Sequence, residues 1–338
     1  MKSSEEIIRF AREALGLSKS ASVEFSRFEG RGSDRTFFRL KWSPHESVIL
    51  VHYDPRRVEN SYWVDLSVFL RDIRIPVPRL LHFDPVRCLI LMEDLGDTDL
   101  WSLRDAPWET RRTLYQKTLS VVNRLHSLPE NEFPSSRVRI MESFGPGLYC
   151  RERNYFMDSF VRAVCRIRLE PSFEEGLERE LSGLAERLDV NGRCLVHRDL
   201  QSQNVMVRRG EPFLIDFQGM RFGSPFYDLG SLLCDPYVRF SAGEQGDLLS
   251  FYYGLSESDM DWPAFQTHFW AASAQRLMQA LGAYGFLGLK KGLKAFLGHI
   301  PAGLHQLQRA AGNVSFLPRL LELSVECRKA IENGKGTI

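Results

Sequence analysis

The sequence lacks several features that would assign it to a special class of protein. Its 338 residues include six cysteines, which are scattered and form no CxxC pair, so neither a disulfide framework nor a zinc cluster is indicated. The net charge is +1, so nothing points to nucleic acid or to an anionic membrane as a partner. We see no internal repeat and no heptad run. We therefore expect a cytoplasmic protein with reduced thiols that binds neither nucleic acid nor membrane.

Long hydrophobic runs are also scarce. The N-terminal segment carries Glu5 and Glu6 among apolar residues at helical spacing, which predicts an amphipathic helix ending near Gly16 and not a signal peptide. The longest apolar stretch, residues 277–297, contains several glycines and a lysine pair. It predicts buried helix segments, because a membrane span needs about 20 predominantly apolar residues.

The most informative feature of the chain is a phosphoryl-transfer motif. His197-Arg198-Asp199 is followed after four residues by Asn204, and Asp216-Phe217 stands where a kinase carries its metal-binding aspartate. Asp199 is the candidate catalytic residue, because its carboxylate can accept a proton from the attacking hydroxyl. Asn204 and Asp216 are the candidate metal ligands, because amide and carboxylate oxygens suit Mg²⁺. The motif predicts an ATP- and Mg²⁺-dependent phosphotransferase with an alcohol group as acceptor.

The segment between Asn204 and Asp216 supports this interpretation. Two short apolar runs, residues 205–207 and 213–215, flank a polar turn that contains Gly210, a pattern typical of a β-hairpin. Such a hairpin would bring the two candidate metal ligands together at its open end.

The rest of the chain divides into two parts of different character. Up to residue 95 the pattern predicts an N-terminal helix, five short strands and one helix inserted after the third strand; from residue 96 onward long helical patterns dominate. We predict an α+β, bilobal protein-kinase-like fold. A small antiparallel-sheet lobe over residues 1–95 would bind nucleotide, and a larger, mainly helical lobe over residues 96–338 would hold the catalytic loop and the acceptor pocket. The predicted strands are 23–28, 36–42, 46–53, 79–83 and 88–92, and the predicted helices are 59–71, 110–128, 154–169, 173–188 and a block over 264–327.

Two segments of the small lobe are candidates for nucleotide binding. The turn that contains Gly30, Gly32 and Ser33 lies between two strands, where glycine lets backbone N–H groups approach phosphate oxygens. The segment with Met92, Glu93 and Leu95 would join the lobes and bind adenine through its backbone. Each pattern has a structural alternative, since a hairpin needs glycine and a strand end is often apolar.

One part expected of a kinase is missing from the sequence. The third strand reads Val48-Ile49-Leu50-Val51-His52 and has no lysine to hold the α- and β-phosphates. Arg39, Lys41 and His52 are possible substitutes. The gap leaves open a catalytically inactive nucleotide-binding scaffold, against which the intact Asp199, Asn204 and Asp216 argue.

A second carboxylate, Asp228, opens an apolar helical run after the metal-binding segment. It could cap a helix or brace the catalytic loop from behind. Both roles are structural, so Asp228 is not counted as catalytic.

Taken together, these motifs resemble the aminoglycoside phosphotransferase and choline kinase superfamily. Within it, the chain is similar to the bacterial sugar kinases that phosphorylate the anomeric hydroxyl of N-acetylmuramate and N-acetylglucosamine in cell-wall recycling. The segments that carry the resemblance are Glu93–Gly96, the loop from His197 to Asn204, Gly32–Arg39, Asp216-Phe217-Gln218 and Gly223–Leu229.

The resemblance implies an amino sugar or a related hexose as the small-molecule acceptor. The chain departs from that branch at Leu200, Gln201 and Gln203, where the branch carries aromatic, histidine and arginine residues that face the acceptor pocket. An alternative is a kinase for choline or an aminoglycoside, whose cationic acceptor needs carboxylates and aromatic faces. Asp235, Glu257, Asp259 and Trp270 leave that alternative open.

Overall fold

The chain forms two compact units, and each is described here by itself. The structure is a computed structural model that describes residues 4–18, 20–28, 35–190, 193–334 and 336. The first unit comprises residues 1–98, 134–141 and 206–218, and the second comprises residues 99–133, 142–205 and 219–338. The predicted α+β fold, with a small antiparallel-sheet lobe and a larger helical lobe, is confirmed.

The first unit is built on a five-stranded antiparallel sheet. Its strand order is β1-β2-β3-β5-β4, and every neighbouring pair is antiparallel. The strands and helices of this unit are α1 (Ser4–Leu15), β1 (Glu24–Arg27), β2 (Thr36–Ser43), β3 (Glu46–His52), α2 (Trp63–Asp72), β4 (Leu80–Asp84) and β5 (Leu89–Glu93). A 3-10 helix over Val58–Tyr62 leads into α2, where the sequence predicted one continuous helix.

The N-terminal helix α1 packs on this sheet. Ile7, Phe10 and Ala11 are buried and share one apolar cluster with side chains of β2, β3 and β5. Their spacing of three and four residues puts them on one face of the helix, with Glu5 and Glu6 left exposed. The period-two alternation of β2 supplies Phe38 and Leu40 to the same cluster. The predicted amphipathic helix is confirmed.

The hairpin predicted between Asn204 and Asp216 is present. It consists of β7 (Val205–Arg208) and β8 (Glu211–Leu214), which pair with each other. The turn uses Gly210 at a φ of 75°, in the left-handed region that favours glycine. The backbone N–H groups of Val207 and Leu214 donate to the carbonyls of Thr98 (2.8 Å) and Pro76 (2.8 Å). These bonds fix the strands of the hairpin, and so the approach to Asp216, within the first unit.

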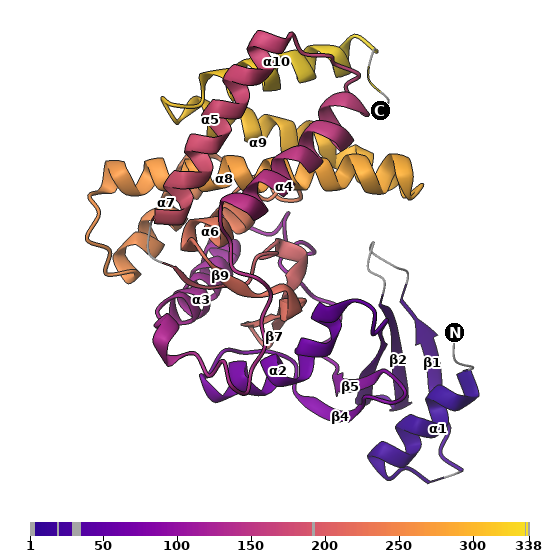
Figure 1. The fold of residues 1–338 in the computed structure, drawn as a ribbon. Helices are drawn as coiled ribbons and strands as arrows, with labels where there is room; N and C mark the ends of the chain where they lie inside the picture. The colour runs from indigo at the N-terminus through magenta and orange to yellow at the C-terminus, as the bar shows by residue number, and fades with distance from the viewer. Residues whose placement is uncertain (1–3, 19, 29–34, 191–192, 335, 337–338) are drawn as a thin grey trace. The chain divides into compact units, whose positions relative to one another are not determined.

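The second unit is a helical assembly built around α8. This helix contacts α4, α6 and α9, and α10 packs on α9 and α5 (Figure 1). Two short strands, β6 and β9, pair in an antiparallel ribbon, and β6 contacts α3 and α6. The elements are α3 (Trp108–His126), α4 (Pro146–Phe156), α5 (Pro171–Val190), β6 (Cys194–Val196), β9 (Arg221–Gly223), α6 (Pro225–Leu233), α7 (Ala242–Leu255), α8 (Trp262–Gly285), α9 (Ile300–Gly312) and α10 (Pro318–Glu332).

The helix predicted over residues 154–169 is wrong in its bounds. Helix α4 begins at Pro146, since proline is favoured in the first turn of a helix. It continues as a π-helix over Met157–Arg162 and has ended by Arg166, whose φ of 56° is incompatible with a helix. A side chain at Gly285 of α8 would clash with the carbonyl oxygen of Ser159. Glycine in the long apolar stretch therefore allows α8 to pack against this π-helix.

The apolar stretch over residues 277–297 is largely helical, as predicted, but it is buried mainly in its first part, within α8; residues 290–295 are exposed, so the prediction of buried segments is wrong there. It comprises the end of α8 and two shorter helical segments, Phe286–Lys290 and Lys294–His299. In the part of the chain that the structure describes, no helix is long and apolar enough to span a bilayer. All six cysteine thiols are free.

Candidate active site

The catalytic loop follows strand β6 in the second unit. Asp199 stands two residues after the buried His197, and its side chain is 27% exposed. The carbonyl of Asp199 accepts hydrogen bonds from the backbone N–H of Gln201 (2.9 Å) and from Nδ2 of Asn204 (2.8 Å). These two hydrogen bonds fix the backbone of Asp199, while its carboxylate stays partly exposed.

Asp228, in the first turns of α6, braces the start of this loop. Its carboxylate is fully buried and accepts the backbone N–H groups of His197 (2.6 Å) and Arg198 (2.8 Å). Nε2 of His126 lies 3.1 Å from the same carboxylate. Arg198 has a φ of 78°, a left-handed conformation that costs a non-glycine residue about 1–3 kcal/mol. The predicted bracing role of Asp228 is confirmed. Its hydrogen bonds to the N–H groups of His197 and Arg198 hold the strained backbone of Arg198 in place.

Asp235, just after α6, braces the other end of the loop. Its Oδ2 accepts both the backbone N–H (2.7 Å) and the hydroxyl (2.6 Å) of Ser202. Its Oδ1 accepts the N–H of Tyr237 at 3.0 Å. Burial raises the pKa of Asp235, and the bonds from Ser202 and Tyr237 oppose that rise. Asp235 is thus occupied in holding the loop.

Asn204 is placed with its side chain folded back onto the loop. Because its Nδ2 donates to the carbonyl of Asp199, its amide oxygen is the atom that can act as a metal ligand. Leu200, expected to face the acceptor, is instead fully buried and packs in the core, whereas Gln201 and Gln203 are half-buried.

Two guanidinium groups face the carboxylate of Asp199. Nη1 of Arg198 donates to its Oδ2 at 3.0 Å. Nη2 of Arg276, on α8, lies 3.6 Å from its Oδ1. The sequence motif contained Arg198, but Arg276 stands 77 positions beyond Asp199 and was not predicted. No local sequence pattern indicates it, because only the packing of α8 brings it to the loop.

A buried polar network lies next to these arginines. Glu152 of α4 accepts hydrogen bonds from the hydroxyl of Tyr227 (3.0 Å) and from Nε2 of Gln275 (3.0 Å). Burial raises the pKa of Glu152, which the charges of Arg198 and Arg276 counteract. Burial also lowers the pKa of the Arg221 guanidinium, whose central carbon lies 5.1 Å from the centre of the Phe144 ring. These residues form a polar interior next to Arg198 and Arg276.

The second predicted metal ligand, Asp216, belongs to the first unit. It has a φ of 63°, and its side chain is 33% exposed. Its Oδ1 is paired with the guanidinium of Arg35 and accepts a 2.9 Å hydrogen bond from Nε2 of Gln218. The following ring, Phe217, is buried and stacks on Trp63 at 5.3 Å. Stacking and turn geometry together hold the carboxylate in place.

The side-chain oxygens of Asn204 and Asp216 suit Mg²⁺, which needs few protein ligands, better than an ion that is bound by protein side chains alone. Within the described residues, no group of three His, Cys, Asp or Glu side chains is arranged to hold a metal ion. Mg²⁺ in kinases is bound by one or two protein oxygens, by water and by the phosphates of the nucleotide. The partly exposed carboxylate of Asp216, in the first unit, and the amide oxygen of Asn204, in the second unit, are each a donor of that kind.

The predicted adenine segment lies at the end of β5. Met92 is buried in the sheet, and Leu95 is buried beyond it. The carboxylate of Glu93 is paired with Nη1 of Arg208 (2.5 Å), and its backbone N–H donates to the carbonyl of Arg79 at 2.9 Å. The segment is therefore ordered by the hairpin of its own unit.

The predicted phosphate-binding residues Gly30, Gly32 and Ser33 lie outside the described residues. Of the proposed substitutes for the missing lysine, Arg39 forms ion pairs with Asp94 (2.7 Å) and Asp97 (2.8 Å) and so secures the segment after β5. Lys41 lies opposite Ser47 in the sheet. Arg35, which immediately follows the glycine-containing turn, is the cation that reaches Asp216. The sequence motif does not indicate this role of Arg35.

Two of the residues considered for binding a cationic acceptor, Asp235 and Trp270, already have other partners. Asp235 is occupied by the catalytic loop, as described above. Glu257 and Asp259 are exposed in the turn between α7 and α8. The ring of Trp270 already carries the guanidinium of Arg309, 5.5 Å from its centre.

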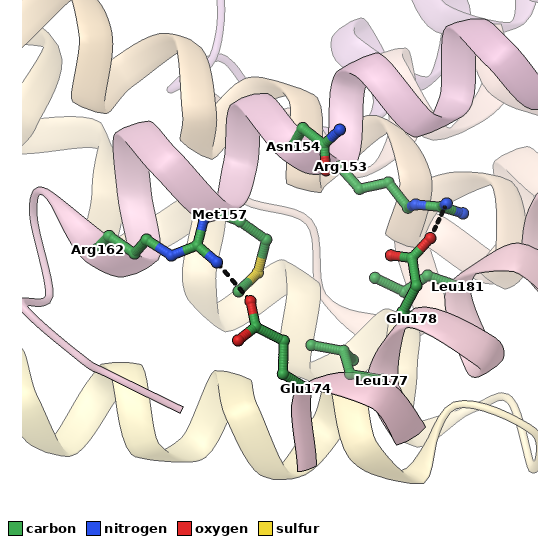
Figure 2. Close-up of a pocket in the computed structure, with 8 residues that line it drawn as sticks. All are labelled: Arg153, Asn154, Met157, Arg162, Glu174, Leu177, Glu178 and Leu181. Carbon is green, nitrogen blue, oxygen red and sulfur yellow. Dashed lines mark hydrogen bonds and ion pairs between the residues drawn. The ribbon is translucent and has the colours of Figure 1, made fainter. Parts of the chain in front are cut away.

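A small cavity of about 60 Å³ lies elsewhere in the second unit, between α4, the π-helix and α5. Figure 2 shows two arginine–glutamate pairs across it, Arg153 with Glu178 and Arg162 with Glu174. Its lining contains no residue of the catalytic loop. The volume is enough for one or two water molecules, and its charges compensate each other.

Comparisons with known proteins agree with this geometry. The sequence pattern of the phosphotransferase enzyme family matches residues 24–265. An N-acetylmuramate/N-acetylglucosamine kinase of Neisseria meningitidis serogroup B is 25% identical over 299 residues, which cover 86% of this chain and 87% of that protein.

Solved structures show the same fold at lower identity. A choline/ethanolamine kinase family protein from Mesorhizobium loti superimposes with a TM-score of 0.62 at 14% identity and covers 94% of this chain and 99% of its own. The aminoglycoside phosphotransferase APH(2'')-Ib, with ADP bound, superimposes with a TM-score of 0.61 at 14% identity, over 92% of this chain and all of its own. The protein-kinase-like fold predicted from the sequence is confirmed.

Proposed function

Because the chain belongs to the phosphotransferase enzyme family, and is thus a small-molecule kinase with a hydroxyl acceptor, we propose that it phosphorylates an N-acetylated amino sugar. The phosphoryl donor is ATP, and the acceptor is the anomeric hydroxyl of N-acetylglucosamine or N-acetylmuramate. The names of the similar curated proteins support this acceptor. So do the sequence segments Gly32–Arg39 and Gly223–Leu229.

The charge around Asp199 is the observation that carries the proposal. The groups next to its carboxylate are the guanidiniums of Arg198 and Arg276. Every candidate acceptor would present a hydroxyl to Asp199, but the ammonium of choline stands only two carbons from that hydroxyl and would be brought close to these like charges, which repel it. A sugar hydroxyl is a neutral group that can accept hydrogen bonds from guanidinium. The arrangement therefore favours a sugar over choline.

Within this proposal the catalytic part of the chain acts by positioning and by proton transfer. Asp199 orients the anomeric hydroxyl and accepts its proton as the oxygen attacks the γ-phosphorus, while the bond from that phosphorus to the β–γ bridging oxygen breaks and ADP leaves. Asp228 and Asp235 hold the loop in place from its two ends. Asn204 and Asp216 would hold Mg²⁺, which supplies charge neutralisation for the phosphates. Little covalent chemistry is left to the protein, so correct placement is the main source of rate.

The nucleotide would be bound by the N-terminal lobe, residues 1–95, and the acceptor by the lobe over residues 96–338. In this scheme Gly30, Gly32 and Ser33 cover the phosphates, and Met92, Glu93 and Leu95 hold the adenine. Arg35 supplies the cation that the third strand lacks, since it lies beside a proposed metal ligand. A cytoplasmic place of action follows from the proposed substrates, ATP and a recycled cell-wall sugar.

The proposal is tested by the chemistry of its product. Transfer to the anomeric oxygen removes the reducing end of the sugar, whereas transfer to any other hydroxyl leaves it intact. Incubation with N-acetylglucosamine or N-acetylmuramate, ATP and Mg²⁺ should consume reducing sugar in a one-to-one ratio with ADP formed. ADP formation with unchanged reducing sugar would contradict the anomeric assignment but not the kinase activity.

The matched control is the methyl glycoside of N-acetylglucosamine, in which the anomeric oxygen is blocked and every other hydroxyl remains. ADP release should fall to the background rate with this compound. Choline and kanamycin complete the panel. Turnover of either, with none of the sugars, would establish an amine kinase in place of the proposed function.

A further inference from the structure

Helix α8 contributes a buried arginine to the catalytic carboxylate, and we infer that Arg276 is a positioning residue for Asp199. The inference rests on the proposed role of Asp199 as the proton acceptor. Arg276 stands far from the catalytic loop in sequence, and its side chain is 5% exposed. It approaches Oδ1 of Asp199 from the interior, while Arg198 hydrogen-bonds Oδ2. Each carboxylate oxygen thus faces a different guanidinium.

The position of Arg276 is fixed by its own partners. Its Nε donates to the hydroxyl of Ser231 at 3.2 Å, and its Nη1 donates to Oε1 of Gln279. Because these two acceptors occupy Nε and Nη1, the guanidinium plane is held and Nη2 is left to face Asp199. A planar group held at two nitrogens has little freedom to turn.

The packing of α6 against α8 makes this arrangement possible. A side chain at Gly230 would place its Cβ 2.8 Å from the Cα of Ser273, so the two helices approach closely only because residue 230 is glycine. The neighbouring Ser231 then reaches Arg276. The same helix α6 carries Asp228, which holds the backbone of the catalytic loop. One helix therefore sets the position of the loop and of the cation that faces its carboxylate.

This geometry gives Arg276 a task that Arg198 cannot perform alone. With Arg198 as its sole partner, the carboxylate of Asp199 would be drawn toward the more exposed side of the loop, since the side chain of Arg198 is 30% exposed. A second cation on the interior side balances that attraction and keeps the carboxylate in one rotamer. A displacement of about 1 Å of a catalytic group can cost on the order of 100-fold in rate.

The first experiment replaces the cation. Arg276→Gln should lower kcat about 10- to 100-fold while the Michaelis constants for ATP and for the acceptor change less than about threefold, because the interaction acts on the reacting carboxylate. Arg276→Lys keeps the charge and should recover part of the loss. The matched control is Arg153→Gln, which removes an equally buried guanidinium (5% exposed) whose partner is Glu178, outside the site. It should leave kcat within about twofold.

A double-mutant cycle separates positioning from a merely structural role. Asp199→Asn alone should reduce kcat about 10²–10⁴-fold. Adding Arg276→Gln to that variant should change kcat less than about twofold, because the residue acts through Asp199. A full additional loss in the double mutant, or an Arg276→Gln variant with unchanged kcat, would overturn the inference. If Asp199→Asn itself keeps its rate, it is the proposed function of Asp199 that fails.

A milder variant keeps the inference testable if Arg276→Gln does not fold. Ser231→Ala removes only the hydroxyl that holds Nε and leaves the guanidinium in place. It should lower kcat severalfold in the native background and should have no effect in the Asp199→Asn background. Each cycle uses the acceptor that gives the fastest ADP release with the unmodified protein. An additive effect of Ser231→Ala would contradict the inference.

Discussion

At the scale of single residues, the site combines groups that the motif predicts with groups that only their neighbours define. Asp199, Asn204 and Asp216 are recognisable from sequence order and spacing. Arg35 and Arg276 are not, although each lies beside one of these carboxylates. Arginine suits both positions, because its planar fork can pair with a carboxylate and keep its charge when buried.

Arg35 gives a prediction for nucleotide binding. Arg35→Ala should raise the Michaelis constant for ATP about tenfold or more, since a hydrogen bond to a charged group is worth roughly 1.5–3 kcal/mol. The Michaelis constant for the acceptor should stay within about twofold. Steady-state kinetics at saturating Mg²⁺ will measure both. Lys41→Ala, in strand β2, is the control and should change neither constant. A larger effect from Lys41 than from Arg35 would assign the missing cation to the strand instead.

At the scale of elements, α6 and α8 determine the geometry of the loop. Helix α6 begins with Pro225 in its first turn, and its buried carboxylate, Asp228, holds two backbone N–H groups of the loop. Helix α8 is capped by Asp261, whose side chain accepts the N–H of Ala264 at 2.8 Å. Helix α7, which we had not predicted, begins with a capping box formed by Ser241 and Glu244. A serine followed three residues later by a glutamate is the sequence pattern of a capping box, so the start of α7 could have been predicted.

The contact of α4 with α8 gives a prediction about stability and pH. Burial raises the pKa of Glu152 above its ordinary value of 4.5. Its contribution to stability is therefore complete below pH 4.5 and is lost as the pH rises through the folded-state pKa. Glu152→Gln removes the ionisation. Because Nε2 of Gln275 donates to Oε2 of Glu152, rotation of the Gln275 amide by half a turn would present its Oε1, which has no hydrogen-bond partner among the described residues, to the new amide N–H.

We expect Glu152→Gln to be more stable than the native protein at pH 8 by on the order of 1 kcal/mol. The gain should shrink toward zero at pH 4.5, where the native carboxyl is also protonated. Thermal unfolding followed by circular dichroism at both pH values will measure it, with Glu178→Gln on the more exposed Arg153 pair as control. If Glu152→Gln is instead less stable than the native protein, and the difference grows as the pH rises, then Glu152 is required as an anion.

At the scale of the whole molecule, two compact units carry different parts of the proposed chemistry. The first unit contains Asp216, and the second contains Asp199 and Asn204. The chain passes from the second unit to the first at residue 206 and returns at residue 219. The predicted metal ligands therefore belong to different units and are connected along the chain by the hairpin of β7 and β8.

The proposed metal role of Asp216 gives a prediction for thermal stability in the presence of nucleotide. A ligand that binds only the folded state at 100 times its dissociation constant stabilises that state by about 2.7 kcal/mol. ADP with Mg²⁺ should therefore raise the unfolding temperature by several degrees, and EDTA should remove most of that rise. Differential scanning calorimetry will measure the shift. Asp216→Ala should lose the Mg²⁺-dependent part, and Arg153→Gln should retain it. An equal shift with and without Mg²⁺ would contradict the metal role of Asp216.

The sequence by itself determined the lobe order, the strand pattern of the first lobe and the catalytic motif. These features depend on local information: hydrophobic periodicity, turn residues and the fixed spacing of Asp199, Asn204 and Asp216. The bounds of α4 were not determined in this way, because the helix passes through a π-helix whose form depends on contact with Gly285.

Only the tertiary structure decided which charges surround Asp199. Arg276 comes from α8, which follows the loop by many residues in the sequence. The carboxylate of Asp235 accepts hydrogen bonds from Ser202 in the loop, so it is occupied and does not serve as a ligand for the acceptor. The identity of an acceptor depends on such surroundings, and they arise when helices distant in sequence pack together. Local patterns specify the chemistry that a kinase performs, whereas packing specifies the electrostatic environment in which its acceptor is held.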